Sequence, residues 1–241
     1  MQTVSQAMKI ISKDLRNDKL QIVWTIIFML YMATVLSFFV NSMFQEPEFV
    51  NPFADFLMLV FIPMLGFIFS RRSFKYLTED SYTQMLFYYR SIPVPTGAVI
   101  MSRALMGLGA FIVNGTIFFG VTYAIASDLR ANMSLASYVA FGLTWIGIGI
   151  LINGSYVYFE CMKNGKSYFW TNFLFTLVFA ISILGLFLVG FRFSLFNYLI
   201  DVSGKWKLLS PYMWGSLIIG ISGYALMCRL TYKRIRLRDL S

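Results

Sequence analysis

Three observations predict that this 241-residue chain is an all-α polytopic membrane protein with six transmembrane helices. Hydrophobic residues make up 58% of the chain and charged residues only 13%. Six long apolar stretches interrupt the sequence, and the lysines and arginines between them gather in alternate loops. A soluble domain built from six such helices would have almost nothing left to face water. We therefore expect one transmembrane domain that covers residues 1–241.

The apolar stretches have the length that a membrane-spanning helix needs. A bilayer core of ~30 Å takes about 20 helical residues at a rise of ~1.5 Å each. Lipid supplies no water to backbone groups, so such stretches must form helices. We expect the spans at about residues 22–40, 53–69, 104–126, 135–159, 173–191 and 211–228. Pro63 should kink the second span because proline removes a backbone donor, and Pro211 suits the first turn of the sixth.

The distribution of basic residues predicts the orientation. Sixteen of the 20 lysines and arginines lie in the amino-terminal tail, the second and fourth loops and the carboxy-terminal tail. The positive-inside rule places these segments, and both termini, in the cytoplasm of a cell-membrane protein. Residues 229–241 then form a basic cytoplasmic tail. The fifth loop opposes this assignment, because it carries Arg192, Lys205 and Lys207 on the outer side. We expect the formal charge of +9 to meet anionic lipid rather than nucleic acid.

The composition argues against most catalytic chemistry. The chain has no histidine and only two cysteines, Cys161 and Cys228, so His-based triads and His metal sites are absent. Both cysteines fall at cytoplasmic helix ends, where a disulfide is not expected. Carboxylates lie at span ends, as Asp55 and Glu160 do, whereas ion-coupled carriers place ionisable groups near the midplane. We expect no catalytic residue, no metal site and no enzyme activity in this chain.

The first 20 residues predict an amphipathic helix rather than a signal peptide. Val4, Met8, Ile11 and Leu15 recur at helical spacing and share one narrow face, with basic residues on the opposite side. Such a helix fits the inner leaflet, just before the chain turns into the first span. The alternative is a helix that packs its narrow face on another protein surface. We favour the membrane because the polar side is basic.

Two amides fall within the spans. Asn114 and Asn153 lie in the glycine-rich third and fourth spans, where small residues let helices approach closely. Each asparagine should bond to a neighbouring helix, and a place in a substrate pathway is the less favoured alternative.

The most informative polar stretch runs from Ser70 to Arg103. Phe74–Arg90 predicts a helix that extends the second span into the cytoplasm, and Ile92-Pro93-Val94-Pro95 ends it. A new helix should start near Thr96. A short apolar knob between two helices could seat in a partner's groove, and a plain helical hairpin is an equal alternative on composition alone.

The sequence YYRSIPVPTGAVIMSR resembles a segment of ABC-2 type transporter permeases that follows their second helix. The resemblance is sharp only over Arg90–Pro95, although the layout of six spans, amphipathic first helix and basic tail is also similar. It implies a coupling helix that docks on an ATPase subunit. The contact residues it implies are Arg90, Ser91, Ile92, Pro93, Val94 and Pro95, of which Pro95 departs from the commoner serine.

The ATPase itself must be another chain. The only Gly-Lys-Ser, at residues 165–167, has Glu160 where a phosphate-binding loop needs its first glycine, and it lies between two spans. We expect no cofactor on this chain, with ATP and Mg bound by the partner. The loop between the fourth and fifth spans predicts a second, smaller ATPase contact through Met162, Lys163, Asn164, Gly165 and Lys166.

The resemblance implies the permease subunit of an ATP-driven exporter. Six helices make half a pathway, so a second permease subunit, identical or related, should complete it. Spans rich in Phe, Met and Leu suit an amphipathic or apolar cargo such as a peptide, a lipid-like molecule or a drug. Two alternatives stay open: a non-transporting membrane scaffold or sensor subunit, and an intramembrane enzyme, which the missing histidine and paired carboxylates oppose.

Overall fold

The computed structural model describes residues 2–45, 47–190, 193–235 and 237–238, and the side chains of all these except residues 2, 43–45 and 47–51. Within these ranges five helices are long and apolar enough to cross a membrane. They are α2 (Lys19–Gln45), α6 (Thr96–Ile125), α8 (Leu135–Met162), α9 (Gly165–Leu188) and α11 (Pro211–Ile235). They contain the first, third, fourth and sixth predicted spans almost entire and most of the fifth. The fold is that of a multi-pass membrane protein, and α6 and α11 begin at Thr96 and Pro211 as predicted.

The second predicted span differs from the prediction of residues 53–69. Helix α3 (Pro47–Met64) stops one residue after Pro63, and its well-described part from Pro52 is shorter than the five long helices. Three tight turns follow, in which Leu65, Gly66 and Phe67 donate to the carbonyls three residues earlier. Proline therefore ends this helix rather than kinking it, since it removes a donor and crowds the preceding turn.

The single helix predicted over Phe74–Arg90 is wrong, because two helices occupy this stretch. Helix α4 (Arg71–Glu79) begins at Ser70, whose side chain and that of Ser73 form a capping box. Helix α5 (Ser81–Ser91) follows after Asp80, which has a φ of 47°. Aspartate tolerates this left-handed conformation better than most residues, so Asp80 turns the chain between the two helices.

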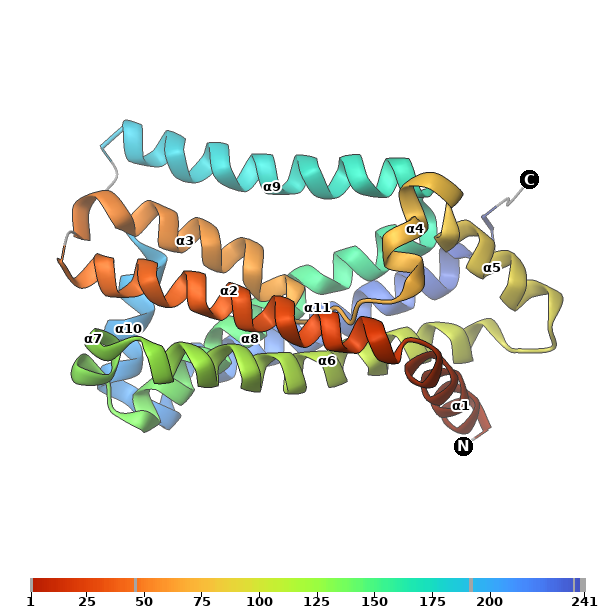
Figure 1. Ribbon diagram of the computed structural model, residues 1–241, viewed down its shortest axis with the longest axis horizontal. Helices are drawn as coiled ribbons and strands as arrows, with labels where there is room; N and C mark the ends of the chain where they lie inside the picture. Colours follow the sequence, from red (N-terminus) through yellow and green to blue (C-terminus); the bar gives the residue numbers. More distant parts are fainter. Residues whose placement is uncertain (1, 46, 191–192, 236, 239–241) are drawn as a thin grey trace.

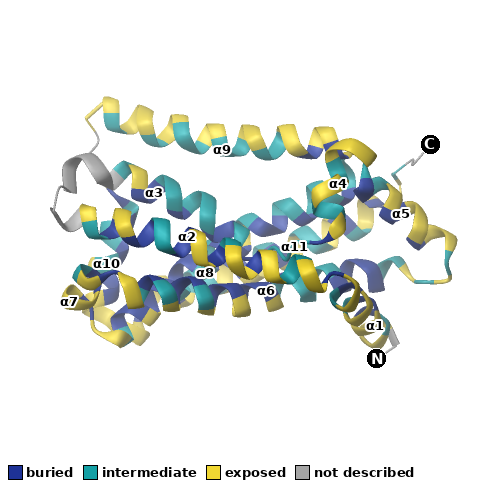
Figure 2. Cartoon of the chain, viewed as in Figure 1, coloured by how far each residue is buried: buried dark blue, intermediate teal, exposed yellow. Residues whose placement is uncertain are grey.

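Helix α8 lies at the centre of the bundle and packs most closely on α11 (Figure 1). Glycines allow this approach: a Cβ on Gly220 would lie 2.2 Å from the carbonyl oxygen of Gly147. Helix α9 stands apart along one side of the bundle. No residue in its most apolar stretch is buried. Figure 2 shows the contrast between the buried inner helices and the exposed turns of α9.

One end of the bundle carries α7 (Ser127–Asn132), α10 (Leu195–Trp206) and a 3-10 turn at Lys207–Leu209. Asp55 of α3 caps α10, because its two oxygens accept from the backbone nitrogens of Phe196 at 2.6 Å and Leu195 at 3.0 Å. A carboxylate at a helix amino terminus satisfies donors that otherwise lack partners. The sequence analysis treated this stretch as a loop.

The opposite end holds α1 (Gln2–Asn17), α4, α5 and the last described residues of the chain. In Figure 1 both termini lie at this end. The predicted contact segments of the chain belong to it as well, since one follows α5 and the other joins α8 to α9. We call it the basic end, because it gathers the loops and tails that carry most of the basic residues.

Candidate functional site

The structure brings the two predicted ATPase-contact segments together over one hydrophobic cluster at the basic end. Ile92 and Val94 of the first segment and Met162 of the second all pack, partly buried, against this cluster. Its buried members come from five helices and are Ile10, Met85, Leu86, Tyr89, Ala98, Val99, Ile100, Cys161 and Ile235. The two segments lie 67 or more residues apart in the sequence and pack against the same cluster.

The first segment presents less apolar surface than the sequence suggested. Ile92 and Val94 turn inward, whereas Ser91, Pro93 and Pro95 are exposed. Arg90 holds the end of the chain, because its Nη2 donates to the carbonyl oxygens of Ile235 and Arg238, each at 2.8 Å. The exposed surface of this segment is therefore a proline ridge on a fixed base.

The second segment is pressed against the turn between α4 and α5. The backbone nitrogen of Gly165 donates to Asp80 Oδ1 at 2.7 Å, and a Cβ on Gly165 would lie 1.6 Å from the carbonyl oxygen of Tyr76. Only glycine permits this approach. Asn164 caps α9 by accepting from the nitrogen of Ser167 at 2.9 Å. Asn164 and Lys166 are exposed, while Lys163 is partly buried and bonds Thr171.

Three tyrosines lock α4, α5 and α9 to one another. The rings of Tyr82 and Tyr168 lie 5.3 Å apart, and Tyr76 lies 5.6 Å from each of them. Aromatic pairs at such distances contribute about 0.5–1.5 kcal/mol beyond their buried area. Burial raises the pKa of Tyr82 far above its usual value, so this phenol stays neutral. This cluster was not predicted from the sequence, because even its nearest members, Tyr76 and Tyr82, are six residues apart.

The carboxy-terminal tail joins the two segments. Arg238 donates through Nη1 to the carbonyl oxygen of Cys161 at 2.5 Å and through Nη2 to Thr83 Oγ1 at 3.0 Å. Cys161 lies in the last turn of α8 and directly precedes the second segment, and Thr83 lies in the helix that carries the first. Burial lowers the pKa of Arg238. Arg238, in the described part of the predicted basic tail, is thus part of the site.

Helix α1 packs on the rest of the chain through a face other than the predicted apolar stripe. Ala7, Ile10 and Asp14 are buried, whereas Val4 and Met8 of the predicted apolar stripe are exposed and Ile11 and Leu15 are partly buried. The buried face packs on α6. Val4 and Met8 therefore remain available to another surface.

Acidic residues fasten α1 and the start of α2 to α4. Asp14 Oδ1 pairs with Arg72 Nη2 at 3.0 Å, and Asp18 Oδ1 accepts from the backbone nitrogen of Arg71 at 3.2 Å. Both carboxylates are buried. The signal in the sequence is that Asp14 and Asp18 follow Ala7 and Ile10 at helical spacing on one face.

A buried ion pair crosses from α6 to α8 beneath the cluster. Arg103 Nη2 and Glu160 Oε1 lie 2.5 Å apart, and their side chains are 14% and 12% exposed. Both residues line a small polar cavity of about 50 Å³, as does Asn153. Arg103 Nε and Asn153 Oδ1 have no partner among the described residues. A cavity of this size and polarity suits ordered water.

Asn114 and Asn153 both donate hydrogen bonds to the backbone at the end of α3 and just after it. Asn114 Nδ2 donates to the carbonyl oxygens of Leu65 and Phe67, each at 2.9 Å. Asn153 Nδ2 donates to that of Pro63 at 3.1 Å. These carbonyls lose their helical donors where the helix ends. The two amides therefore bond the backbone of a neighbouring segment.

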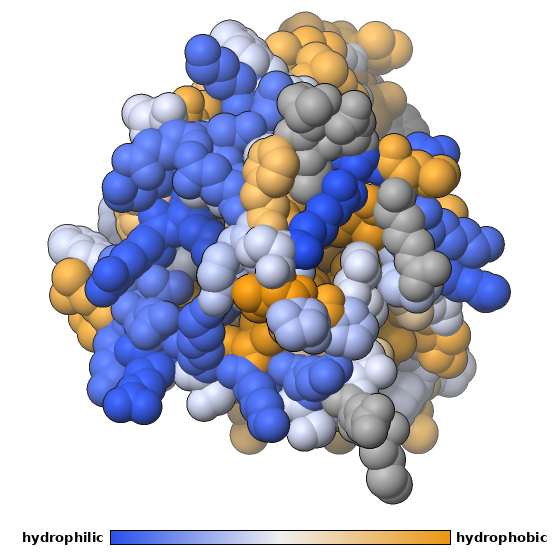
Figure 3. Space-filling view, turned by 90° about the vertical axis from the view of Figure 1, so that its right-hand side faces the viewer, coloured by the Kyte–Doolittle hydropathy of each residue, from blue (hydrophilic) through white to orange (hydrophobic). Residues whose placement is uncertain are grey.

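The surface of the basic end combines polar and apolar side chains. Viewed end-on, it is mainly hydrophilic with a small hydrophobic area near its middle (Figure 3). Among the described residues no group of three or more His, Cys, Asp or Glu could hold a metal ion. Cys161 is buried and Cys228 half-buried, and both are free thiols.

Replacing Glu160 by Gln should destabilise the protein, because Arg103 would keep its charge in a buried setting without a carboxylate. Breaking a buried pair costs about 3–5 kcal/mol. Thermal unfolding in detergent, followed by circular dichroism, measures the effect. The matched control is Glu79→Gln, which removes the exposed pair with Lys75 and should cost about 0.3–0.5 kcal/mol. Equal effects of the two variants would contradict a structural role for the buried pair.

No protein-family model, curated protein or solved structure matches this chain.

Proposed function

We propose that this chain is the permease subunit of an ATP-driven exporter of ABC-2 type, which lies in the cell membrane with both termini in the cytoplasm. Its basic end docks on a separate ATPase subunit that binds ATP and Mg. The observation that carries this proposal is the convergence of the Arg90–Pro95 and Met162–Lys166 segments on one cluster. Two segments chosen from sequence for the same role share one rigid surface.

The connections within the basic end support a coupling role. Motion imposed on either segment meets a base tied by Asp80–Gly165, by Arg238 and by Arg90. The ion pair of Arg103 with Glu160 continues these ties into α6 and α8. A chain of packed and hydrogen-bonded elements can pass a displacement to the spanning helices.

Helix α3 acts as the sixth span in this proposal. Its 18 residues reach ~27 Å at ~1.5 Å per residue, close to the thickness of a bilayer core. Asp55 lies midway along this helix, and its carboxylate is buried against the amino terminus of α10. Helices α4 and α5 then form a cytoplasmic hairpin between the second and third spans.

The proposed partner within the membrane is a second permease subunit. Helix α9 exposes large apolar side chains along much of its length, including Phe173, Leu177, Ile181 and Leu184. Lipid or a second subunit can cover them. With α2 and α3, this helix is our candidate for the contact between subunits and for the route of an amphipathic or apolar cargo.

A labelling experiment tests the orientation. Ser42→Cys should react with a membrane-impermeant thiol reagent added outside intact cells, whereas Ser91→Cys should react only after the membrane is opened. Both serines are exposed in the structure, so access depends on the membrane and not on burial. The wild-type chain, with Cys161 and Cys228, gives the background. The reverse pattern would overturn the proposed orientation.

Acidic substitutions at exposed positions of the two segments test the coupling surface. Pro93→Asp and Lys166→Glu should each reduce recovery of the ATPase subunit with the purified permease by roughly tenfold or more, the equivalent of ~1.4 kcal/mol or more in affinity. A charge without a partner is costly to bury at an interface. The measurement is co-purification from native membranes of an ATPase that contains a phosphate-binding loop, with its ATP hydrolysis rate. Ile92 is less suitable, because it packs into the chain's own cluster.

Ser12→Asp provides the control, since Ser12 is exposed on α1 and lies outside both segments. It should leave ATPase recovery unchanged. Normal recovery of the ATPase subunit with both Pro93→Asp and Lys166→Glu would reject the coupling surface. Absence of any ATPase from the wild-type preparation would favour the non-transporting scaffold instead.

A further inference from the structure

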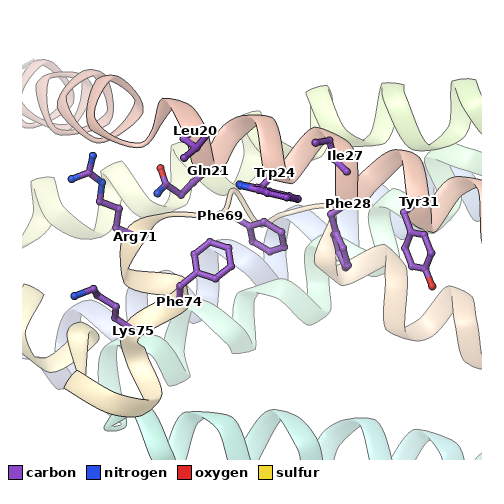
Figure 4. A pocket seen from close by; sticks show the side chains of 10 residues that line it. All are labelled: Leu20, Gln21, Trp24, Ile27, Phe28, Tyr31, Phe69, Arg71, Phe74 and Lys75. Carbon is purple, nitrogen blue, oxygen red and sulfur yellow. The ribbon is translucent and has the colours of Figure 1, made fainter.

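A groove beside the basic end combines an aromatic wall with a cationic mouth. It lies between α2, the segment after α3 and the start of α4, and has a volume of about 760 Å³, within the range of small-molecule sites. Figure 4 shows Arg71 and Lys75 extending toward the side on which α1 lies, while Trp24, Phe69 and Phe74 line the part farther from it.

Aromatic rings in tilted and edge-to-face contact build the wall of this groove. The centroids of Phe28 and Phe69 lie 5.3 Å apart, and those of Phe69 and Phe74 lie 5.6 Å apart. Trp24 is 53% exposed and Phe74 is 62% exposed. Large apolar side chains that remain open in this way mark a surface that another apolar group covers.

The mouth of the groove favours an anion. Arg71 is the first residue of α4, so the positive end of that helix adds to its charge. Two carboxylates oppose it. Asp18 is buried, accepts from the Arg71 backbone and lies 4.0 Å from its Nε, and Glu79 pairs with Lys75 on the surface at 2.7 Å. The Arg71 side chain is 71% exposed, and an exposed pair such as Lys75–Glu79 is weak, so both cations can meet a phosphate.

Gln21 adds a polar requirement at the same mouth. Its Oε1 atom is buried and has no partner among the described residues, and the residue lines the groove. A buried acceptor needs a donor. A headgroup that carries hydroxyl groups beside its phosphate can supply one.

We propose that this groove binds one anionic phospholipid, whose phosphate lies between Arg71 and Lys75 and whose acyl chain lies along Trp24, Phe28, Phe69 and Phe74. The occupant is a resident lipid of the leaflet at the basic end. The proposal rests on the membrane placement of this end and is independent of ATP-driven transport. Its failure would leave the coupling surface untouched.

Trp24 reports on the groove directly, because brominated acyl chains quench tryptophan on contact. The protein is reconstituted in phosphatidylcholine vesicles that contain increasing fractions of brominated phosphatidylglycerol or brominated phosphatidylcholine. Phosphatidylglycerol should reach half of its quenching at a mole fraction lower by about fivefold for each basic residue at the mouth. Trp24→Phe should remove this selective component and leave the quenching of the other four tryptophans.

Charge variants separate the groove from general attraction to anionic lipid. Lys75→Gln should reduce the selectivity about fivefold, and Arg71→Gln with Lys75→Gln should abolish it. The single variant leaves the Asp18 contact intact, so it guards against a folding defect. Lys9→Gln with Lys233→Gln removes two exposed charges at the same end that do not line the groove, and should leave selectivity unchanged.

Three results would overturn the proposal. The first is equal quenching of the wild-type protein by both lipids. The second is an equal loss of selectivity in the Lys9 and Lys233 control. The third is a Trp24 that neither lipid quenches, as expected if a protein segment or a second copy of the chain fills the groove.

Discussion

The structure depends on how the backbone between Met64 and Arg71 satisfies its hydrogen bonds inside an apolar bundle. Phe69 donates to Thr25 Oγ1, Ser70 to Ser73 Oγ and Arg71 to Asp18 Oδ1. The side chain of Asn114 donates to the carbonyl oxygens of Leu65 and Phe67, and that of Asn153 donates to the carbonyl oxygen of Pro63. Irregular backbone inside an apolar bundle persists only where protein groups supply its partners. A Cβ on Gly66 would lie 2.5 Å from Phe111, so the segment also requires glycine there.

This segment positions the basic end. It directs the chain from α3 into α4, so that Asp80 meets Gly165 and the three tyrosines come together. It also forms part of the aromatic wall through Phe69. The coupling surface and the lipid groove that we propose therefore share a single element, and a change in that element would affect both.

Periodicity and length predicted the parts of the fold that depend on local sequence. Apolar runs located five long helices, and Thr96 and Pro211 marked two beginnings, whereas Pro63 was expected to kink a helix that instead ends at Met64. Contacts between distant residues were beyond such reasoning. Nothing near Asp55 indicates that it caps Phe196, and nothing near Arg238 indicates that it reaches Cys161. The break at Asp80 was missed because the flanking residues favour helix and a single left-handed aspartate leaves no periodic signal. The inward position of Ile92 likewise depends on α1, α5 and α11 arriving at one cluster.

Hydrogen–deuterium exchange over residues 65–71 tests most directly whether the backbone between α3 and α4 is a rigid, hydrogen-bonded element. The account predicts slow exchange of the amides of Phe67, Phe69 and Arg71 in the wild-type protein. It predicts faster exchange there in Asn114→Leu, because the Leu65 and Phe67 carbonyls lose a shared donor, a loss that costs about 1–3 kcal/mol. Exchange in α8 and α11 should stay unchanged. Rapid exchange of these amides in the wild-type protein, at the rate of an unstructured loop, would contradict the account.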